Sequence, residues 1–68
     1  MEISARNQLT GTVTDIQIGA VMAEVVIDVN GSTIVAAITK DSVEKLGIAV
    51  GGTCTAVIKA TDVMVAVG

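Results

Sequence analysis

The stretch that decides the fold is VMAEVVIDVNGSTIVAAI, residues 21–38. Its first half alternates between two faces, as a β-strand with one buried face does. Asn30-Gly31 follows, and this pair is the strongest short hairpin signal because both turn positions favour a positive φ. The stretch predicts two antiparallel strands, Val21–Val29 and Ser32–Ile38, joined by a tight turn.

A longer apolar run precedes this hairpin, from about Arg6 to Ile18, and Gly19-Ala20 then turns the chain. The parity of its apolar residues changes between Val13 and Ile16. Because side chains in a strand alternate with a period of two, a slip of one residue indicates a β-bulge. We expect a long first strand with a bulge near Thr14–Asp15.

One helical segment follows the hairpin, Lys40–Leu46, and Gly47 ends it as the C′ residue. Thr39 and Asp41 are both possible N-caps, and Asp41 with Glu44 three residues later fits a capping box.

Two further apolar runs complete the chain, Thr53–Lys59 and Val63–Val67, separated by Thr61-Asp62. The predicted order is three strands, one helix and two strands. The sequence thus predicts an all-β fold, a five-stranded OB-fold-like Greek-key barrel with one short helix between strands 3 and 4. At 68 residues, the chain is expected to form one domain, 1–68.

The composition predicts a thin core. Aromatic residues, proline and histidine are absent, and aromatic side chains normally supply the largest buried areas. Such small domains need a disulfide, a metal or oligomerisation, and the single Cys54 provides neither of the first two. The last three predicted strands are also apolar on both faces. Both observations predict a homo-oligomer.

Several function classes are disfavoured. Four cationic residues in a chain of net charge -3, with no aromatic side chains, make a poor nucleic-acid-binding surface. Neither a signal peptide nor an apolar run of about 20 residues is recognisable, so we expect a cytoplasmic protein without a membrane partner. Without histidine the usual general base is missing. Cys54 alternates with Ala56 and Ile58 as a packing residue would, so we expect no enzyme.

What remains is a set of hydrogen-bond donors. They are Ser4, Ala5, Arg6 and Asn7 near the N-terminus, Thr39 and Ser42 at the first helical turn, and Lys59 at the end of the fourth run. A tetrahedral dianion only accepts hydrogen bonds, so its site must supply donors and positive charge. On spacing alone, however, helix caps, turn residues and a solvated lysine explain these residues more simply.

Three segments carry a family resemblance that changes this weighting: SARNQLTG (residues 4–11), TKDSVEKLG (39–47) and AVIKATDV (56–63). They resemble the molbindins, the small molybdate-binding proteins of the Mop/TOBE type, over essentially the whole chain. The N-terminal octet is the most specific of the three.

The resemblance implies an OB-like fold, a hexamer built as a trimer of dimers, and molybdate or tungstate bound at subunit interfaces as the intact oxyanion. It implies no catalytic cofactor and no direct metal ligand. The oxyanion-binding residues that it implies are Ser4, Ala5, Arg6, Thr39, Ser42, Lys59 and Ala60. Related molybdate-sensing domains often have serine at the last position, so Ala60 can contribute only its backbone N–H. A second class of site near the symmetry axes is implied, without assignable residues.

The expected function is intracellular storage or homeostasis of molybdenum. The alternative is a structural oligomeric OB-fold module without a specific ligand, in which Ser4 and Arg6 serve assembly. A nucleic-acid-binding OB domain is the third and least favoured hypothesis.

Overall fold

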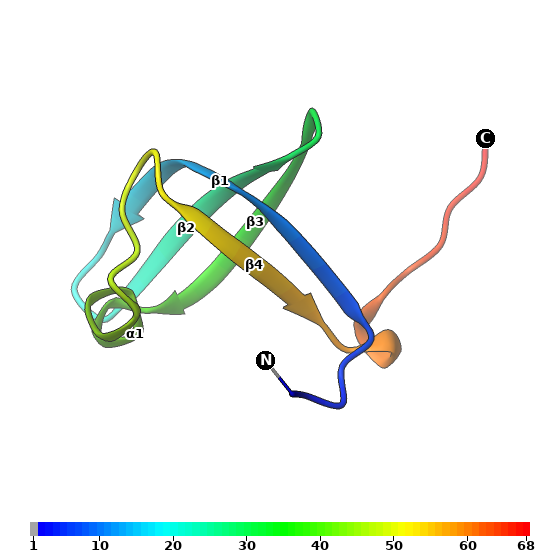
Figure 1. The fold of residues 1–68 in the computed structure, drawn as a ribbon, viewed down its shortest axis with the longest axis horizontal. Coiled ribbons are helices and arrows are strands. Elements are labelled where there is room, and N and C mark those ends of the chain that lie inside the picture. Colours follow the sequence, from blue (N-terminus) through cyan, green and yellow to red (C-terminus); the bar gives the residue numbers. More distant parts are fainter. Residues whose placement is uncertain (1) are drawn as a thin grey trace.

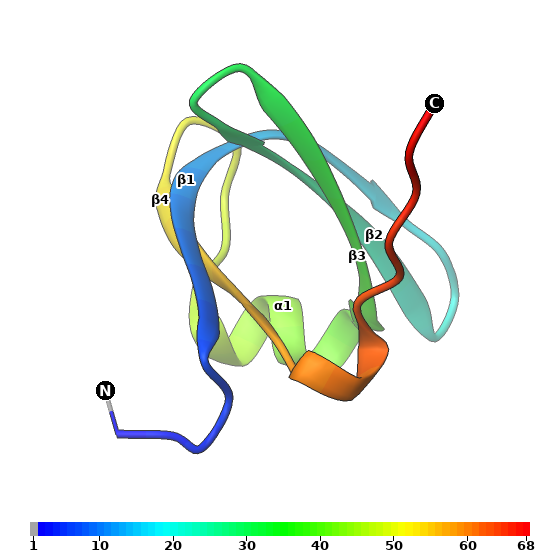
Figure 2. The same cartoon turned by 90° about the vertical axis from the view of Figure 1, so that its right-hand side faces the viewer.

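Four antiparallel strands form one curled sheet in the computed structural model, which describes residues 2–68 (Figures 1 and 2). The elements in chain order are β1 (Asn7–Ile18), β2 (Met22–Val29), β3 (Ser32–Thr39), α1 (Lys40–Leu46), β4 (Thr53–Ile58) and the 3₁₀ turn η1 (Ala60–Asp62). The strands lie in the order β3-β2-β1-β4. Because the fourth strand returns to lie beside the first, the topology is the expected Greek key.

The predicted hairpin is confirmed. β2 and β3 pair in register from Val29 opposite Ser32 onwards. Asn30 and Gly31 have φ values of 50° and 89°, so both turn residues adopt the positive φ that a type I′ turn requires. Local sequence alone is therefore sufficient to place this turn.

The predicted bulge in β1 is also confirmed. Val13 lies opposite Ile27, whereas Asp15 lies opposite Val26, so Thr14 is the extra residue. Nearby, a Cβ on Gly11 would collide with the carbonyl oxygen of Asp28. Glycine at this position lets β1 lie against β2 as the sheet begins to curl.

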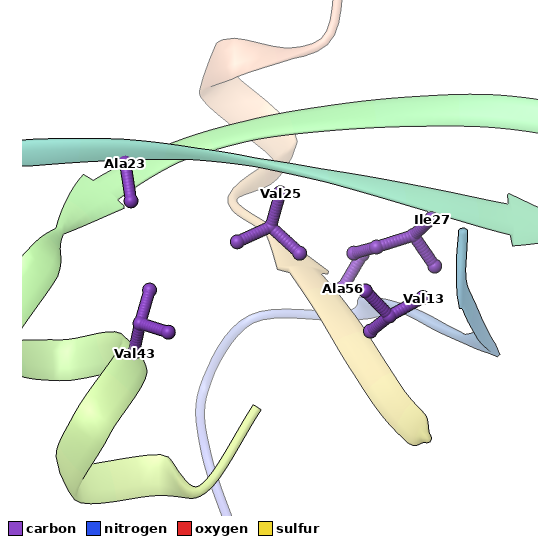
Figure 3. Close-up of a cluster of buried hydrophobic side chains, with 6 residues drawn as sticks. All are labelled: Val13, Ala23, Val25, Ile27, Val43 and Ala56. Atoms are coloured by element: carbon purple, nitrogen blue, oxygen red, sulfur yellow. The ribbon is translucent and has the colours of Figure 1, made fainter. Parts of the chain in front are cut away.

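The core is small and aliphatic, as the composition predicts. Side chains from three strands and the helix point toward one another in Figure 3, and none of them is aromatic. The buried members are Val13, Ala23, Val25, Ile27, Val43 and Ala56. Cys54 is half-buried and packs against this cluster, so it lies less deeply than the alternation predicted.

The helix α1 has Thr39, and not Asp41, as its N-cap. The Thr39 Oγ1 accepts a hydrogen bond from the Ser42 N–H at 3.0 Å, and Gly47 closes the other end with a φ of 65°. Asp41 instead lies inside the helix and pairs with Lys45 at 3.1 Å on the surface. The capping box of Asp41 and Glu44 was therefore wrong. No helix within residues 2–68 is long and apolar enough to cross a membrane.

The predicted fifth strand, Val63–Val67, was also wrong. After Ile58 the chain forms η1, because the Asp62 N–H donates to the Lys59 carbonyl at 2.9 Å. This turn redirects the chain away from β4, so the C-terminal residues pair with no strand in the described part of the chain (Figure 1). A strand exists only where a neighbouring strand satisfies its backbone groups, and the residue pattern does not reveal such a neighbour.

Candidate functional site

The fold divides the predicted site residues between two places. Ser4, Ala5, Arg6, Lys59 and Ala60 lie where β1 begins and β4 ends, beside η1; we call this the η1 end. Thr39 and Ser42 lie at the start of α1, which we call the α1 end. The two ends lie well apart in Figure 1, so a single chain does not bring all seven residues together.

The strand register sets two cationic residues opposite each other at the η1 end. Asn7 and Ile58 are the last register pair of β1 and β4. Extending this register by one residue sets Arg6 opposite Lys59, on the outer face of the sheet. Directly opposed residues of an antiparallel pair have Cβ atoms about 4.5–5.5 Å apart, and like charges there repel each other.

Neither cation forms an ion pair with a carboxylate among residues 2–68. The ion pair present among residues 2–68 joins Lys45 and Asp41 at the α1 end, and the side chains of both Arg6 and Lys59 belong to exposed residues. Two opposed, unpaired cations cost electrostatic free energy, which an anion held between them would offset.

Backbone donors add to the same end. Lys59 is the N-cap of η1, and the first hydrogen bond of the turn comes from Asp62. A 3₁₀ turn has no acceptor of its own for its first N–H groups, so those of Ala60 and Thr61 have no partner within the turn. Ala60 thus retains the backbone donor that the resemblance implied, without a hydroxyl.

Two amide side chains hold the N-terminal segment. The Gln8 Nε2 donates to the Ala5 carbonyl at 3.0 Å, and the Asn7 Nδ2 donates to the Ile58 carbonyl at 3.2 Å. Neither was among the predicted oxyanion-binding residues. For Asn7 the available signal was the poor β propensity of asparagine, which is unusual at the start of a strand but does not identify a partner.

The hydroxyls at the α1 end are already engaged with each other. The Thr39 and Ser42 oxygens lie 2.7 Å apart, and either can donate to the other. Since each hydroxyl carries one proton and their contact uses one, the pair keeps a single O–H donor for a ligand. The helix cap and a ligand-binding role are therefore compatible, but the pair supplies fewer donors than its residue types suggest.

A shallow, open depression lies beside Thr39. It is lined by Ala20, Val21, Thr39, Lys40, Asp41 and Glu44. Two of its lining residues are carboxylates, one of them paired with Lys45. The positive charges of the lysines here are balanced by these carboxylates. A dianion bound at this depression would therefore need cations from elsewhere.

The fold and site define a small OB-like β domain with a donor-rich, cationic end. Comparison with known proteins gives the family. The model of the TOBE domain family matches residues 3–65, so the chain belongs to that family, and the resemblance seen in the sequence is confirmed.

The chain is similar to proteins named for molybdenum. It is 52% identical to molybdenum-pterin-binding protein 1 of Clostridium pasteurianum over 96% of this chain and 97% of that protein. It is 46% identical to a probable molybdenum-pterin-binding protein of Haemophilus influenzae over 98% of this chain and 99% of that one. A solved molybdate binding protein from Sporomusa ovata superposes with a TM-score of 0.93 at 48% identity, covering 97% and 98% of the two chains. The curled sheet with one short helix is thereby confirmed as this family's fold.

Proposed function

We propose that this chain binds molybdate, and tungstate in the same way, as the intact tetrahedral oxyanion. The observation that carries the proposal is the register of β1 and β4, which opposes Arg6 and Lys59 without a carboxylate partner in residues 2–68. The names of the relatives and of the similar solved structure support molybdenum as the element.

The oxyanion site is shared between two copies of the chain. The η1 end of one copy supplies both cations, the Ser4 hydroxyl and the N–H groups of Ala5 and Ala60. The α1 end of a second copy supplies Thr39 and Ser42. This proposal rests on the separation of the two ends in Figure 1, since residues so far apart cannot contact one small ion within one chain.

Exposed apolar residues support an oligomer. The C-terminal segment after η1 exposes 94% of Met64, 88% of Val65 and 98% of Val67. On the outer face of β3, Val35 is 58% exposed. A chain of this size cannot keep so much apolar surface in water at low cost, and a second copy would cover it. We propose a homo-oligomer, with the hexamer implied by the family resemblance as the expected state.

The ligand is the oxyanion and not a molybdenum–pterin complex. Proteins commonly hold flat heterocycles between aromatic side chains, and this chain contains none. Its site residues offer hydroxyl, backbone N–H and cationic donors, which match the acceptor-only oxygens of a dianion.

The biological role that fits these features is storage or homeostasis of the anion by a single domain spanning 1–68, without catalysis. The charge of -3 and the missing aromatic platform disfavour nucleic acid as a partner. Cys54 is a free thiol, which suits the reducing cytoplasm.

Calorimetric titration with molybdate, tungstate and sulfate tests the proposal. The first two should bind saturably, and sulfate should bind more weakly because its smaller tetrahedron leaves longer hydrogen bonds. Light scattering on the same sample should show an oligomer. If none of the three anions binds and the oligomer is intact, the chain is the structural module that the sequence left as an alternative.

A further inference from the structure

Asn7 occupies a special place in the sheet. It is the last β1 residue that pairs with β4, and its neighbours in the two strands are Arg6 and Lys59. Its side chain is half-buried and crosses between the strands, where Nδ2 donates to the Ile58 carbonyl at 3.2 Å. This hydrogen bond joins residues 51 positions apart in sequence, so it is a tertiary link and not a local turn.

The link acts directly on the geometry of the cationic pair. The Ile58 carbonyl and the Lys59 N–H belong to one planar peptide unit, so fixing the oxygen also fixes the direction in which the Lys59 residue leaves the strand. On the other strand, Asn7 is itself the residue that directly follows Arg6, so the same hydrogen bond also restrains the backbone next to Arg6. One side-chain amide therefore restrains the positions of both cationic residues.

Asn7 cannot itself reach an anion held between these cations. Alternation along β1 places its side chain with Leu9, Gly11 and Val13 toward the concave face, whereas Arg6 belongs to the outer face. The Asn7 amide therefore lies behind the backbone that carries the two cations.

We propose that Asn7 is a positioning residue that sets the separation of Arg6 and Lys59 and thereby the size of oxyanion the site prefers. The inference rests on the proposed function. Strand ends fray, and without the amide the two cations, which repel each other, would move apart. A wider or variable separation would weaken binding and reduce discrimination between anions of different size.

The test compares Asn7→Leu, which keeps the branched shape but has no donor, with Thr10→Val. Thr10 provides the matched control because its Oγ1 contacts the Thr55 Oγ1 at 3.0 Å, a cross-strand link in the same ladder but away from the cations. Molybdate binding is measured by calorimetry and sulfate binding by competition, on oligomers checked by light scattering. The ratio of the two affinities is the decisive readout, because general destabilisation would not change it.

Asn7→Leu should weaken molybdate binding about tenfold, near the upper value of one net hydrogen bond, and should lower the molybdate-to-sulfate ratio about fivefold. Thr10→Val should change both by less than about twofold. Asn7→Gln, which keeps an amide donor on a longer arm, should recover part of the loss. Asn7→Ala replaces the leucine variant if that variant does not fold.

Equal effects of Asn7→Leu and Thr10→Val, or an unchanged affinity ratio in Asn7→Leu, would overturn the inference while molybdate binding by the parent protein stands. Absence of saturable molybdate binding in the parent protein would instead overturn the proposed function, and the inference with it.

Discussion

The α1 end and the η1 end of the sheet differ in how completely their polar groups are satisfied. At the α1 end, Thr39 caps the helix, Asp41 pairs with Lys45, and the helix buries Val43 against the core. At the η1 end, no residue of the turn is buried, and Arg6 has no carboxylate partner within residues 2–68.

The difference indicates which polar and charged groups are satisfied within the chain and which ones depend on other molecules. The α1 end uses its charges and hydroxyls for its own stability, whereas the η1 end opposes two cations and exposes an apolar segment. Both features at the η1 end cost free energy in an isolated chain. A ligand and a second copy of the chain would remove these costs, which is why this end determines binding in our proposal.

The largest difference between the two ends is expected when each of the four cationic side chains is removed in turn. Arg6→Ala and Lys59→Ala should each weaken molybdate binding by roughly 2–5 kcal/mol, because an enclosed dianion loses one of its two charges. Lys40→Ala and Lys45→Ala, at the α1 end, should have little effect. Calorimetric titration of the four variants measures this, and equal small losses in all four would mean that binding is diffuse electrostatics.

The close packing of β1 against β2, on which both ends of the sheet depend, is tested at Gly11. Gly11→Ala should lower the free energy of unfolding by about 3 kcal/mol, since the new methyl group forces β1 and β2 apart at Asp28. Urea unfolding monitored by circular dichroism gives the value, with Thr10→Ala on the outer face as control. A stability equal to that of the parent chain would show that the strands separate at no cost.

The α1 end is expected to respond in stability more than in binding. Thr39→Ala should cost about 1 kcal/mol of unfolding free energy through the lost cap, and Thr39→Ser should restore most of it. Asp41→Ala removes only an exposed ion pair and should change little. If Thr39→Ala instead abolished binding at unchanged stability, the hydroxyl would contribute to the anion site and nothing to the helix cap.

The smallest effect is expected at Cys54. Its side chain is half-buried against the core, so Cys54→Ala should cost at most about 1 kcal/mol of stability, by the loss of one sulfur from an incompletely enclosed site. Molybdate affinity should not change. A large loss of affinity in an intact oligomer would reveal a role for the thiol.

Local patterns were sufficient wherever neighbouring residues decide the conformation. The turn at Asn30-Gly31 and the bulge at Thr14 follow from the φ preference of two residues and from side-chain parity, so both could be predicted. The sequence did not decide whether Thr39 or Asp41 is the N-cap, because both side chains can accept the same kind of hydrogen bond. Only the residue at which the helix starts distinguishes them.

Features that depend on residues far apart in the sequence could not be predicted from the local residue pattern. Val63–Val67 has the composition of a strand, but β4 ends in η1 and leaves it without a pairing partner in the described chain. The partner of Asn7 was likewise not predictable, since its hydrogen bond to Ile58 joins residues 51 positions apart in the sequence.

The sequence by itself determined the first four strands and the helix, the aliphatic core, the hairpin turn and, through the family resemblance, which residues to consider for an anion. Only the tertiary structure decided that the strand register sets Arg6 opposite Lys59, that the Thr39 and Ser42 hydroxyls hydrogen-bond to each other, and that the two groups stand at separate ends. The physical reason is that side-chain parity and turn preferences act over a few residues, whereas the meeting of charges depends on the register between strands far apart in the chain.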